Sequence, residues 1–237
     1  MELTSGHRVI VVVLAAWLMM AAPAHAQEDS KFLAPGFKTR PAASRLVIVP
    51  ADIEMFSISA GGVSEPKADW TELAGVNLKA ALAASQDKLG ANVQTFDMKD
   101  LDELAEISAL HGAVAQAVFI HHAIGMVKLP TKDGKLDWSM GDAVLPLKEK
   151  TGADYALFTW IRDSYASPER KAAMVAMAML GVGLVGGQQI GYASLVDLNT
   201  GRIVWFNDLR RATGDLREAK PALETVEALL KGFPAAK

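Results

Sequence analysis

The sequence has 237 residues, with 24 basic and 27 acidic side chains and no cysteine. Hydrophobic residues make up 51% of the chain, which excludes a disordered tail protein and a collagen-like chain. The absence of cysteine excludes thiol catalysis, cysteine-ligated zinc, iron–sulfur clusters and a disulfide scaffold. The formal charge of −3 argues against a general nucleic-acid-binding protein, which needs a basic surface.

The first 26 residues have the organisation of a secretory signal. Arg8 ends a short polar start, residues 9–22 are apolar, and Ala24 and Ala26 are small residues at positions −3 and −1 of a cleavage point. The apolar run is shorter than the roughly 20 residues of a membrane-spanning helix. We therefore expect cleavage after Ala26 and a periplasmic protein that is not a lipoprotein. An uncleaved anchor is the alternative, because Glu2 offsets the charge of Arg8.

The mature chain is predicted to be an extended arm over residues 27–44 and a single α/β domain over residues 45–237, with α+β as the alternative class. We expect a mixed β-sheet with helices packed against it, ending in a β-hairpin and a C-terminal helix. The predicted strands are residues 46–49, 55–59 (an edge strand or extended segment), 93–96 and 154–163, with a hairpin of residues 189–198 and 202–207. The predicted helices follow Pro66 and Asp97, and two more cover residues 141–150 and 219–230.

The same patterns predict which side chains form the core. Trp160 and Trp205 lie in strongly apolar strands and are expected to be buried in one core. Asp97, Asp100, Asp102, Glu103 and Glu106 are interpreted as helix-capping acids rather than a metal site. The first helix is expected to bury the stripe Trp70, Leu73, Val76, Ala80 and Ala84.

Residues 172–187 consist only of Ala, Met, Leu, Val and Gly. One interpretation is a crossover helix buried against the sheet, where small residues let backbones approach each other. The other is an apolar flap that docks on a partner or a membrane surface, since methionine-rich segments adapt to many surfaces. Four arginines, at positions 202, 210, 211 and 217, are either a patch for an anionic envelope polymer or a solvated face. The candidate interaction surface is Met174, Met177, Leu180, Leu184, Arg210 and Arg211.

No motif predicts a cofactor. Gly181, Gly183 and Gly186 match the dinucleotide fingerprint G-x-G-x-x-G, but that fingerprint works only between a strand and a helix, and here the order is inverted. Adjacent helical residues point about 100° apart, so His121 and His122 do not chelate one ion together. We therefore expect no nucleotide, no metal and no other cofactor.

Hydrolytic chemistry has weak support in the sequence. The elbow G-x-S-x-G is absent, and Ser194 lies on a predicted strand without a sharp turn. A glycosidase needs two carboxylates with tuned pKa values in one cleft. The acids near predicted strand ends, from which such a pair would have to come, are Asp52, Glu54, Asp163, Asp197 and Asp208.

Two stretches together resemble known proteins. One is GADYALF at residues 152–158, and the other is GYASLVDL at residues 191–198 followed by IVWFN at residues 203–207. Behind a signal peptide, the pair resembles small α/β domains of bacterial envelope proteins: the curli-secretion channel family, the TolB N-terminal domain and lipoprotein activators of penicillin-binding proteins. The resemblance implies an interaction module without catalysis, and it transfers no site residue. This chain departs from the lipoprotein members because it has no cysteine to carry the lipid.

We therefore expect an exported, periplasmic, non-catalytic protein that binds another envelope component. Its partner would be an envelope protein or a membrane surface, with no nucleic acid and no nucleotide. One alternative is an exported hydrolase that uses strand-end carboxylates. Another is a membrane-peripheral protein that uses residues 172–187.

Overall fold

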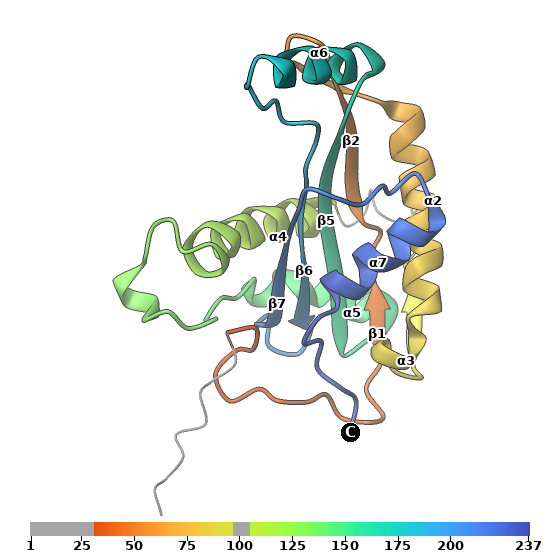
Figure 1. Ribbon diagram of the computed structural model, residues 1–237. Helices are drawn as coiled ribbons and strands as arrows, with labels where there is room; N and C mark the ends of the chain where they lie inside the picture. The colour runs from red at the N-terminus through yellow and green to blue at the C-terminus, as the bar shows by residue number, and fades with distance from the viewer. Residues whose placement is uncertain (1–30, 97–104) are drawn as a thin grey trace, which may run out of the picture. The chain divides into compact units, whose positions relative to one another are not determined.

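The computed structural model describes residues 31–96 and 105–237 (Figure 1). Within these ranges the chain has a mixed α/β fold built on one seven-stranded sheet. The strands are β1 (Leu46–Ile48), β2 (Asp52–Ile58), β3 (Ser64–Pro66), β4 (Val93–Thr95), β5 (Tyr155–Ala166), β6 (Gln189–Asp197) and β7 (Ile203–Arg211). The α-helices are α2 (Ala68–Ala84), α3 (Gln86–Leu89), α4 (Ala105–Val118), α5 (Leu145–Thr151), α6 (Pro168–Met179) and α7 (Ala219–Leu229). Shorter turns are the π-helix η3 (Phe119–Ala123) and the 3₁₀ helices η4 (Pro130–Lys132) and η5 (Gly141–Val144).

The strand β5 is the centre of the sheet. On one edge it pairs in parallel first with β1, Leu46 opposite Tyr155, and then with β2, Asp52 opposite Trp160. The register shifts by one residue between these two pairings, at Pro50, which has no N–H group to donate to a strand ladder. On its other edge β5 pairs with the antiparallel strand β6. Two short strands therefore act as one partner for a strand of 12 residues.

The remaining strands extend the sheet outward. The strand β4 lies parallel to β1, β7 lies antiparallel to β6, and β3 lies antiparallel to β2. The predicted strand at residues 55–59 is therefore not an edge strand, because the chain turns back at residues 60–63 and adds β3 outside β2. The predicted hairpin at residues 189–207 is confirmed as β6 and β7, and the class of a mixed sheet with packed helices is confirmed.

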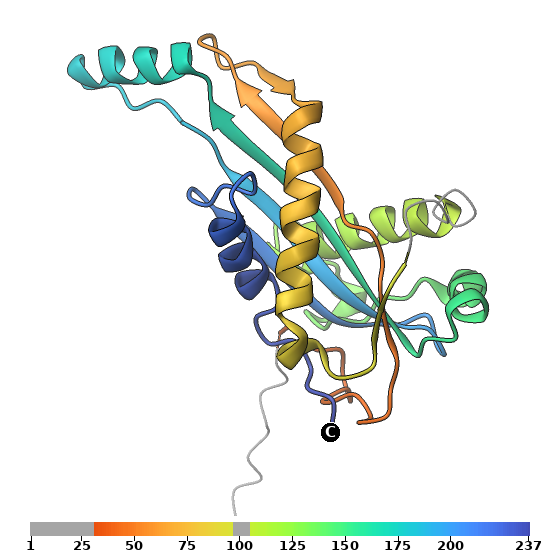
Figure 2. The same cartoon turned by 90° about the vertical axis from the view of Figure 1, so that its right-hand side faces the viewer.

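Helices cover both faces of the sheet (Figure 2). The helices α2 and α7 contact each other on one face, where Leu157 and Ile161 of β5 belong to their core. Residues of α4 and α5 pack on the other face with Ala156 and Phe158. Alternate side chains of β5 thus enter two separate cores, which explains why its sequence is almost continuously apolar.

Two expectations about the core are wrong. The helix α2 buries Ala74, Leu78, Ala81 and Leu82, whereas Leu73 and Val76 of the predicted stripe are 46% and 63% exposed. The buried stripe thus lies one residue further along the helix than Leu73 and Ala80, and Trp70 of the predicted stripe still packs against this core.

Trp205 is fully buried in the core beneath α2 and α7, but Trp160 is only half-buried and packs in the core on the opposite face. Trp160 lies on β5 one residue before Ile161, which faces the α2 and α7 core, so its side chain faces the other way.

Residues 31–44 of the predicted arm pack against the rest of the domain. The backbone N–H of Ala34 donates to the Val204 carbonyl at 2.9 Å, and Leu33 forms a bridge with Trp205. Arg40 is 1% exposed and donates to the carbonyls of Leu89 and Pro234. The arm and the C-terminal tail are thereby joined.

Among the described residues, no helix combines the length and apolar character needed to cross a membrane. Of the acidic residues interpreted as helix caps, those at positions 97–103 lie outside the described residues. Glu106 lies in the first turn of α4.

The burial of Trp205 predicts a large loss of stability on truncation. Trp205→Ala is expected to lower the free energy of unfolding by about 3–5 kcal/mol, because it leaves a cavity in the core beneath α2 and α7. Trp205→Phe keeps most of the volume and removes an indole N–H that has no hydrogen-bond partner, so it should cost less than about 1.5 kcal/mol. Urea unfolding followed by circular dichroism measures both. A loss below about 1 kcal/mol for Trp205→Ala would contradict the buried position.

Candidate functional site

The helix α6 lies beyond the ends of β2 and β5, in a connection between β5 and β6 (Figures 1 and 2). The Ser167 side chain starts it by accepting a hydrogen bond from the backbone N–H of Arg170 at 3.1 Å, and Pro168 occupies the first turn. The helix ends at Met179, and Gly181 at φ +78° turns the chain back toward β6. We call residues 172–187 the apolar tip.

Several contacts hold the apolar tip in a defined conformation. The guanidinium of Arg170 donates to the Val185 carbonyl at 3.3 Å and to the Ala60 carbonyl at 3.2 Å. The backbone N–H of Ala166 donates to the Gly186 carbonyl at 2.7 Å. A Cβ at Gly187, whose φ is +147°, would overlap the backbone of Ser164. Helix and return segment are therefore fixed to each other and to β5.

The outward side chains of the apolar tip are strongly exposed. Exposed fractions are 82% for Met179, 75% for Leu180, 64% for Val185, 60% for Val175 and 43% for Val182. No residue of α6 is buried. The interpretation of a crossover helix buried against the sheet is therefore wrong, because α6 lies beyond the strand ends, where no sheet surface is left to cover it.

The predicted interaction residues do not form one surface. Met174, Met177 and Leu184 are half-buried, and the space beside Gly186 is filled by the Met174 side chain. Leu180 is exposed on the apolar tip.

The two predicted arginines lie on β7 instead. The side chain of Arg210 pairs with Asp208 at 2.9 Å, and that of Arg211 contacts Glu224 at 3.9 Å. Arg202 lies at the opposite end of β7, where it donates to the Pro35 carbonyl at 3.4 Å. The arginines therefore do not gather in a basic patch.

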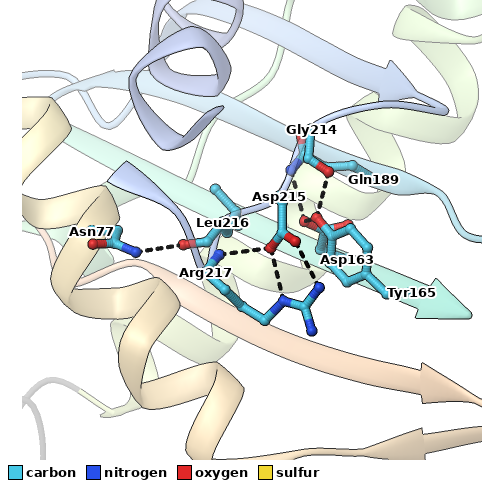
Figure 3. Close-up of polar contacts among 8 residues, drawn as sticks. All are labelled: Asn77, Asp163, Tyr165, Gln189, Gly214, Asp215, Leu216 and Arg217. Atoms are coloured by element: carbon cyan, nitrogen blue, oxygen red, sulfur yellow. Dashed lines mark hydrogen bonds and ion pairs between the residues drawn. The ribbon is translucent and has the colours of Figure 1, made fainter. Parts of the chain in front are cut away.

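A buried polar cluster lies at the base of this connection (Figure 3). Asp163 is 1% exposed, and its carboxyl group accepts from the Gln189 amide at 2.8 Å. The Tyr165 hydroxyl lies 2.5 Å from Asp163 and 2.6 Å from the Gly214 carbonyl, and Thr225 donates to Gln189 at 3.0 Å. Asp163 was expected at a strand end, but β5 continues to Ala166 and carries it into the interior.

The surroundings of Asp163 shift its pKa in opposite directions, with burial the larger effect. Burial raises the pKa of Asp163, although hydrogen bonds from Tyr165, Gln189 and the Leu216 backbone oppose the shift. The Tyr165 hydroxyl has one proton but lies within hydrogen-bond distance of two oxygens. The contacts of this hydroxyl with the Asp163 carboxyl group and with the Gly214 carbonyl therefore share one proton.

The loop before α7 carries an internal ion pair, and its arginine also contacts the Tyr165 ring of the cluster. Arg217 donates from Nε at 2.8 Å and from a terminal nitrogen at 2.6 Å to the two oxygens of Asp215. Burial would raise the pKa of Asp215, but the hydrogen bonds from Arg217 outweigh it and hold that pKa below its usual value. The same guanidinium lies 4.1 Å from the Trp70 ring and 4.4 Å from the Tyr165 ring. Asn77 of α2 also donates to the Leu216 carbonyl at 2.9 Å.

Beside this cluster is a hollow of about 590 Å³. Its floor comes from the ends of β2 and β5, and its walls come from the first turns of α2 and α6 and from Arg217. We call it the hollow. It is lined by Ser57, Ser59, Ala60, Glu65, Lys67, Trp70, Ala166, Ser167, Pro168, Glu169, Lys171 and Arg217.

The sequence did not single out the hollow, because its residues come from four separate stretches and none forms a motif. Two of its lining residues were nevertheless noticed for other reasons, Trp70 in the predicted stripe of the first helix and Arg217 among the four arginines, and Asp163 lies in the adjacent cluster.

A serine and a histidine do meet, in the core under α4. The ring of His111 lies 2.7 Å from the Ser194 hydroxyl and stacks on Phe158 at 3.9 Å between centroids. His111 is 5% exposed and Ser194 is fully buried. Burial lowers the pKa of His111 to about 3, so the ring is neutral at pH 7. The pair has no access for a substrate and serves packing.

The other strand-end carboxylates are each engaged locally. Asp52 and Glu54 both pair with Arg162, at 2.7 Å and 3.3 Å, on the opposite face of the sheet from Asp163. Asp197 accepts from the backbone N–H of Asn199 at 2.8 Å in the β6–β7 turn. Asp52 and Glu54 thus share one arginine on one strand, whereas Asp163 and Asp197 are held elsewhere by their own hydrogen bonds.

The remaining candidates are placed as follows. His121 and His122 lie in η3, where their rings contact the carbonyls of Val127 and Lys31, each at 2.7 Å. The glycines of the fingerprint follow α6 and precede β6, which is the inverse of a dinucleotide-binding turn.

Comparison with known proteins finds only solved structures of low similarity. No known family matches the sequence, and no curated protein matches it. Among solved structures, the PelC dodecamer from Paraburkholderia phytofirmans matches with 13% identity and a TM-score of 0.40, covering 84% of this chain and 95% of that one. Lipoprotein GNA1162 from Neisseria meningitidis matches with 13% identity and a TM-score of 0.32, covering 79% and 94%. The LpoB C-terminal domain from Salmonella enterica matches with 12% identity and a TM-score of 0.28, covering 75% and 87%.

The polar cluster predicts a contrast between two substitutions of Asp163. Asp163→Ala leaves Tyr165 and Gln189 without their buried partner and should lower the free energy of unfolding by about 2–3 kcal/mol. Asp163→Asn keeps the size of the side chain and an oxygen that accepts a hydrogen bond, so it should cost about 1 kcal/mol less than Asp163→Ala. Urea unfolding of both variants measures the contrast, and equal losses would contradict a stabilising role for the hydrogen bonds that Asp163 accepts.

The buried histidine predicts a pH dependence. The folded pKa of His111, about 3, is below the ordinary value of 6.5, so the unfolded chain binds the proton more readily between these values. Stability from this group is therefore complete above pH 6.5 and is lost by about 1.4 kcal/mol per unit as the pH falls toward 3. His111→Gln does not titrate, so its unfolding free energy should fall less steeply over this range. Parallel slopes in variant and wild type would refute the assignment.

Proposed function

We propose that this chain is an exported, non-catalytic protein of the bacterial cell envelope, and that it binds another envelope component through the apolar tip. The observation that carries the proposal is the exposure of the tip. A monomeric soluble protein seldom leaves such a continuous apolar surface uncovered, and surfaces of this kind mark interaction sites. The signal-like residues 1–26 support export.

Three features support binding rather than catalysis. The serine–histidine pair of Ser194 and His111 is sealed in the core. The carboxylates of Asp52, Glu54 and Asp208 are held in ion pairs with neighbouring arginines. In contrast, the two most exposed large apolar side chains of the described residues, Met179 and Leu180, stand together with Val185 and Val175 on a segment that lies away from both cores.

A membrane surface is the second candidate partner, and one observation favours it. Exposed apolar side chains lie on both α6 and the return segment, and no charged residue occurs between Lys171 and Asp197. A segment that is apolar on several sides fits insertion between the lipids at the membrane interface, where apolar side chains contact the acyl chains.

Two matched substitutions test the role of the apolar tip. Met179→Glu puts a charge on a side chain that is 82% exposed, so the melting temperature should stay within about 2 °C of the wild type. Val76→Glu on α2 is the control, because Val76 is also apolar and 63% exposed but lies outside the tip. A photo-crosslinker at Val182 in the exported protein reads out contacts in intact cells.

We expect the crosslinker to give one discrete protein adduct, which Met179→Glu abolishes and Val76→Glu leaves unchanged. Binding to phosphatidylglycerol–phosphatidylethanolamine vesicles, with the same dependence on the two variants, would assign the membrane as partner instead. Neither adduct nor vesicle binding, in a protein that stays folded, would overturn the proposal.

A further inference from the structure

Some polar groups that line the hollow have partners within the protein, and others do not. Lys67 pairs with Glu65 at 3.7 Å, and Arg217 is engaged by Asp215. Glu169 is held by its own backbone N–H and by the Ser167 hydroxyl, which lower its pKa. The two acidic side chains of the lining are thus already neutralised or hydrogen-bonded within the protein.

Ser57 is the first group left over. It lies on β2 in the floor of the hollow and is 6% exposed. No other group in residues 31–96 or 105–237 forms a hydrogen bond with its hydroxyl. Although the residue is almost enclosed, its hydroxyl oxygen is not sealed in the core, and it lines a space large enough to supply a hydrogen-bond partner.

Lys171 is the second group. It lies in the first turn of α6 and in the lining of the hollow, and its ammonium group has no ion pair within the described part of the chain. Asp215 is near enough to feel its charge but is held by Arg217. Lys171 therefore carries a positive charge that nothing in the lining offsets directly.

The start of α2 is the third. Its N-cap residue, Lys67, makes no side-chain cap, so the N–H groups of Ala68, Asp69 and Trp70 have no capping partner among the described residues. Lys67 and Trp70 both line the hollow, which places this end of a 17-residue helix at its wall. The exposed Asp69 carboxylate is in the same turn but not in the lining.

The groups left over share one property, which is that each of them donates hydrogen bonds. A ligand that fits these donors, next to a lysine and an uncapped helix start, is a negatively charged group that accepts hydrogen bonds. We propose that the hollow is a binding site for a small oxyanion group, a phosphate or a carboxylate, held by Lys171, the Ser57 hydroxyl and the first turn of α2. This site is separate from the apolar tip, and its test does not depend on the proposed function.

The probes are inorganic phosphate and acetate, added at constant ionic strength to the full-length protein, with sodium chloride as the blank. Backbone amide signals in ¹⁵N–¹H spectra report binding at residues 68–70 and at Ser57. We expect saturable shifts at these amides and not at the start of α7. Shifts with one probe alone identify the oxyanion as phosphate or carboxylate, and shifts with both support a general oxyanion site.

Substitutions then assign the shifts to the hollow. Lys171→Gln should weaken binding about tenfold, because it removes a charge-assisted hydrogen bond. Ser57→Ala should weaken it about threefold, and Lys79→Gln, an exposed lysine of α2 outside the lining, should leave it unchanged. Lys171 is exposed, so its variant should keep the wild-type melting temperature. No saturable shift with either probe, or equal affinity in Lys171→Gln, would overturn the proposal.

Discussion

The structure depends on the double pairing of β5. This strand is the partner of β1 and β2 on one edge and of β6 on the other, so its backbone hydrogen bonds join the N-terminal and C-terminal halves of the chain. Its alternating side chains also enter both cores. The strand then runs past the cores, and Asp163 and Tyr165 near its end anchor the polar cluster. The end of β5 that extends beyond the cores positions both the apolar tip and the hollow.

Sequence reasoning located the elements well because their signals are local. The strand at residues 154–163, the hairpin at residues 189–207 and the last helix depend on apolar runs and turn residues that act over a few positions. It failed where contacts between residues far apart in the sequence determine which side chains are buried. The buried stripe of α2 consists partly of alanines, which become core only because the sheet and α7 lie close to them.

The candidate sites divide in the same way. The composition of residues 172–187 was recognisable, but whether the segment is buried depended on where β5 ends, and that length is set by pairing with β2 and β6. The hollow could not be predicted from the sequence, because Ser57, Trp70 and Lys171 come together only in the folded structure. Asp163 was noticed as an acid near a strand end, whereas its burial and its contact with Tyr165 follow from β5 continuing three residues further.

The packing of residues 31–34 has a consequence for assembly. The strand β7 ends the sheet on one side, and a bare outer strand is a template for pairing with another chain. Leu33 and Ala34 occupy its first half, while Asp208, Arg210 and Arg211 place charges along the second. Open-ended growth of the sheet from one molecule to the next is thereby blocked on this side. Any association there has to use side-chain surfaces, which restricts it to partners of matching shape and protects the chain from fibre formation.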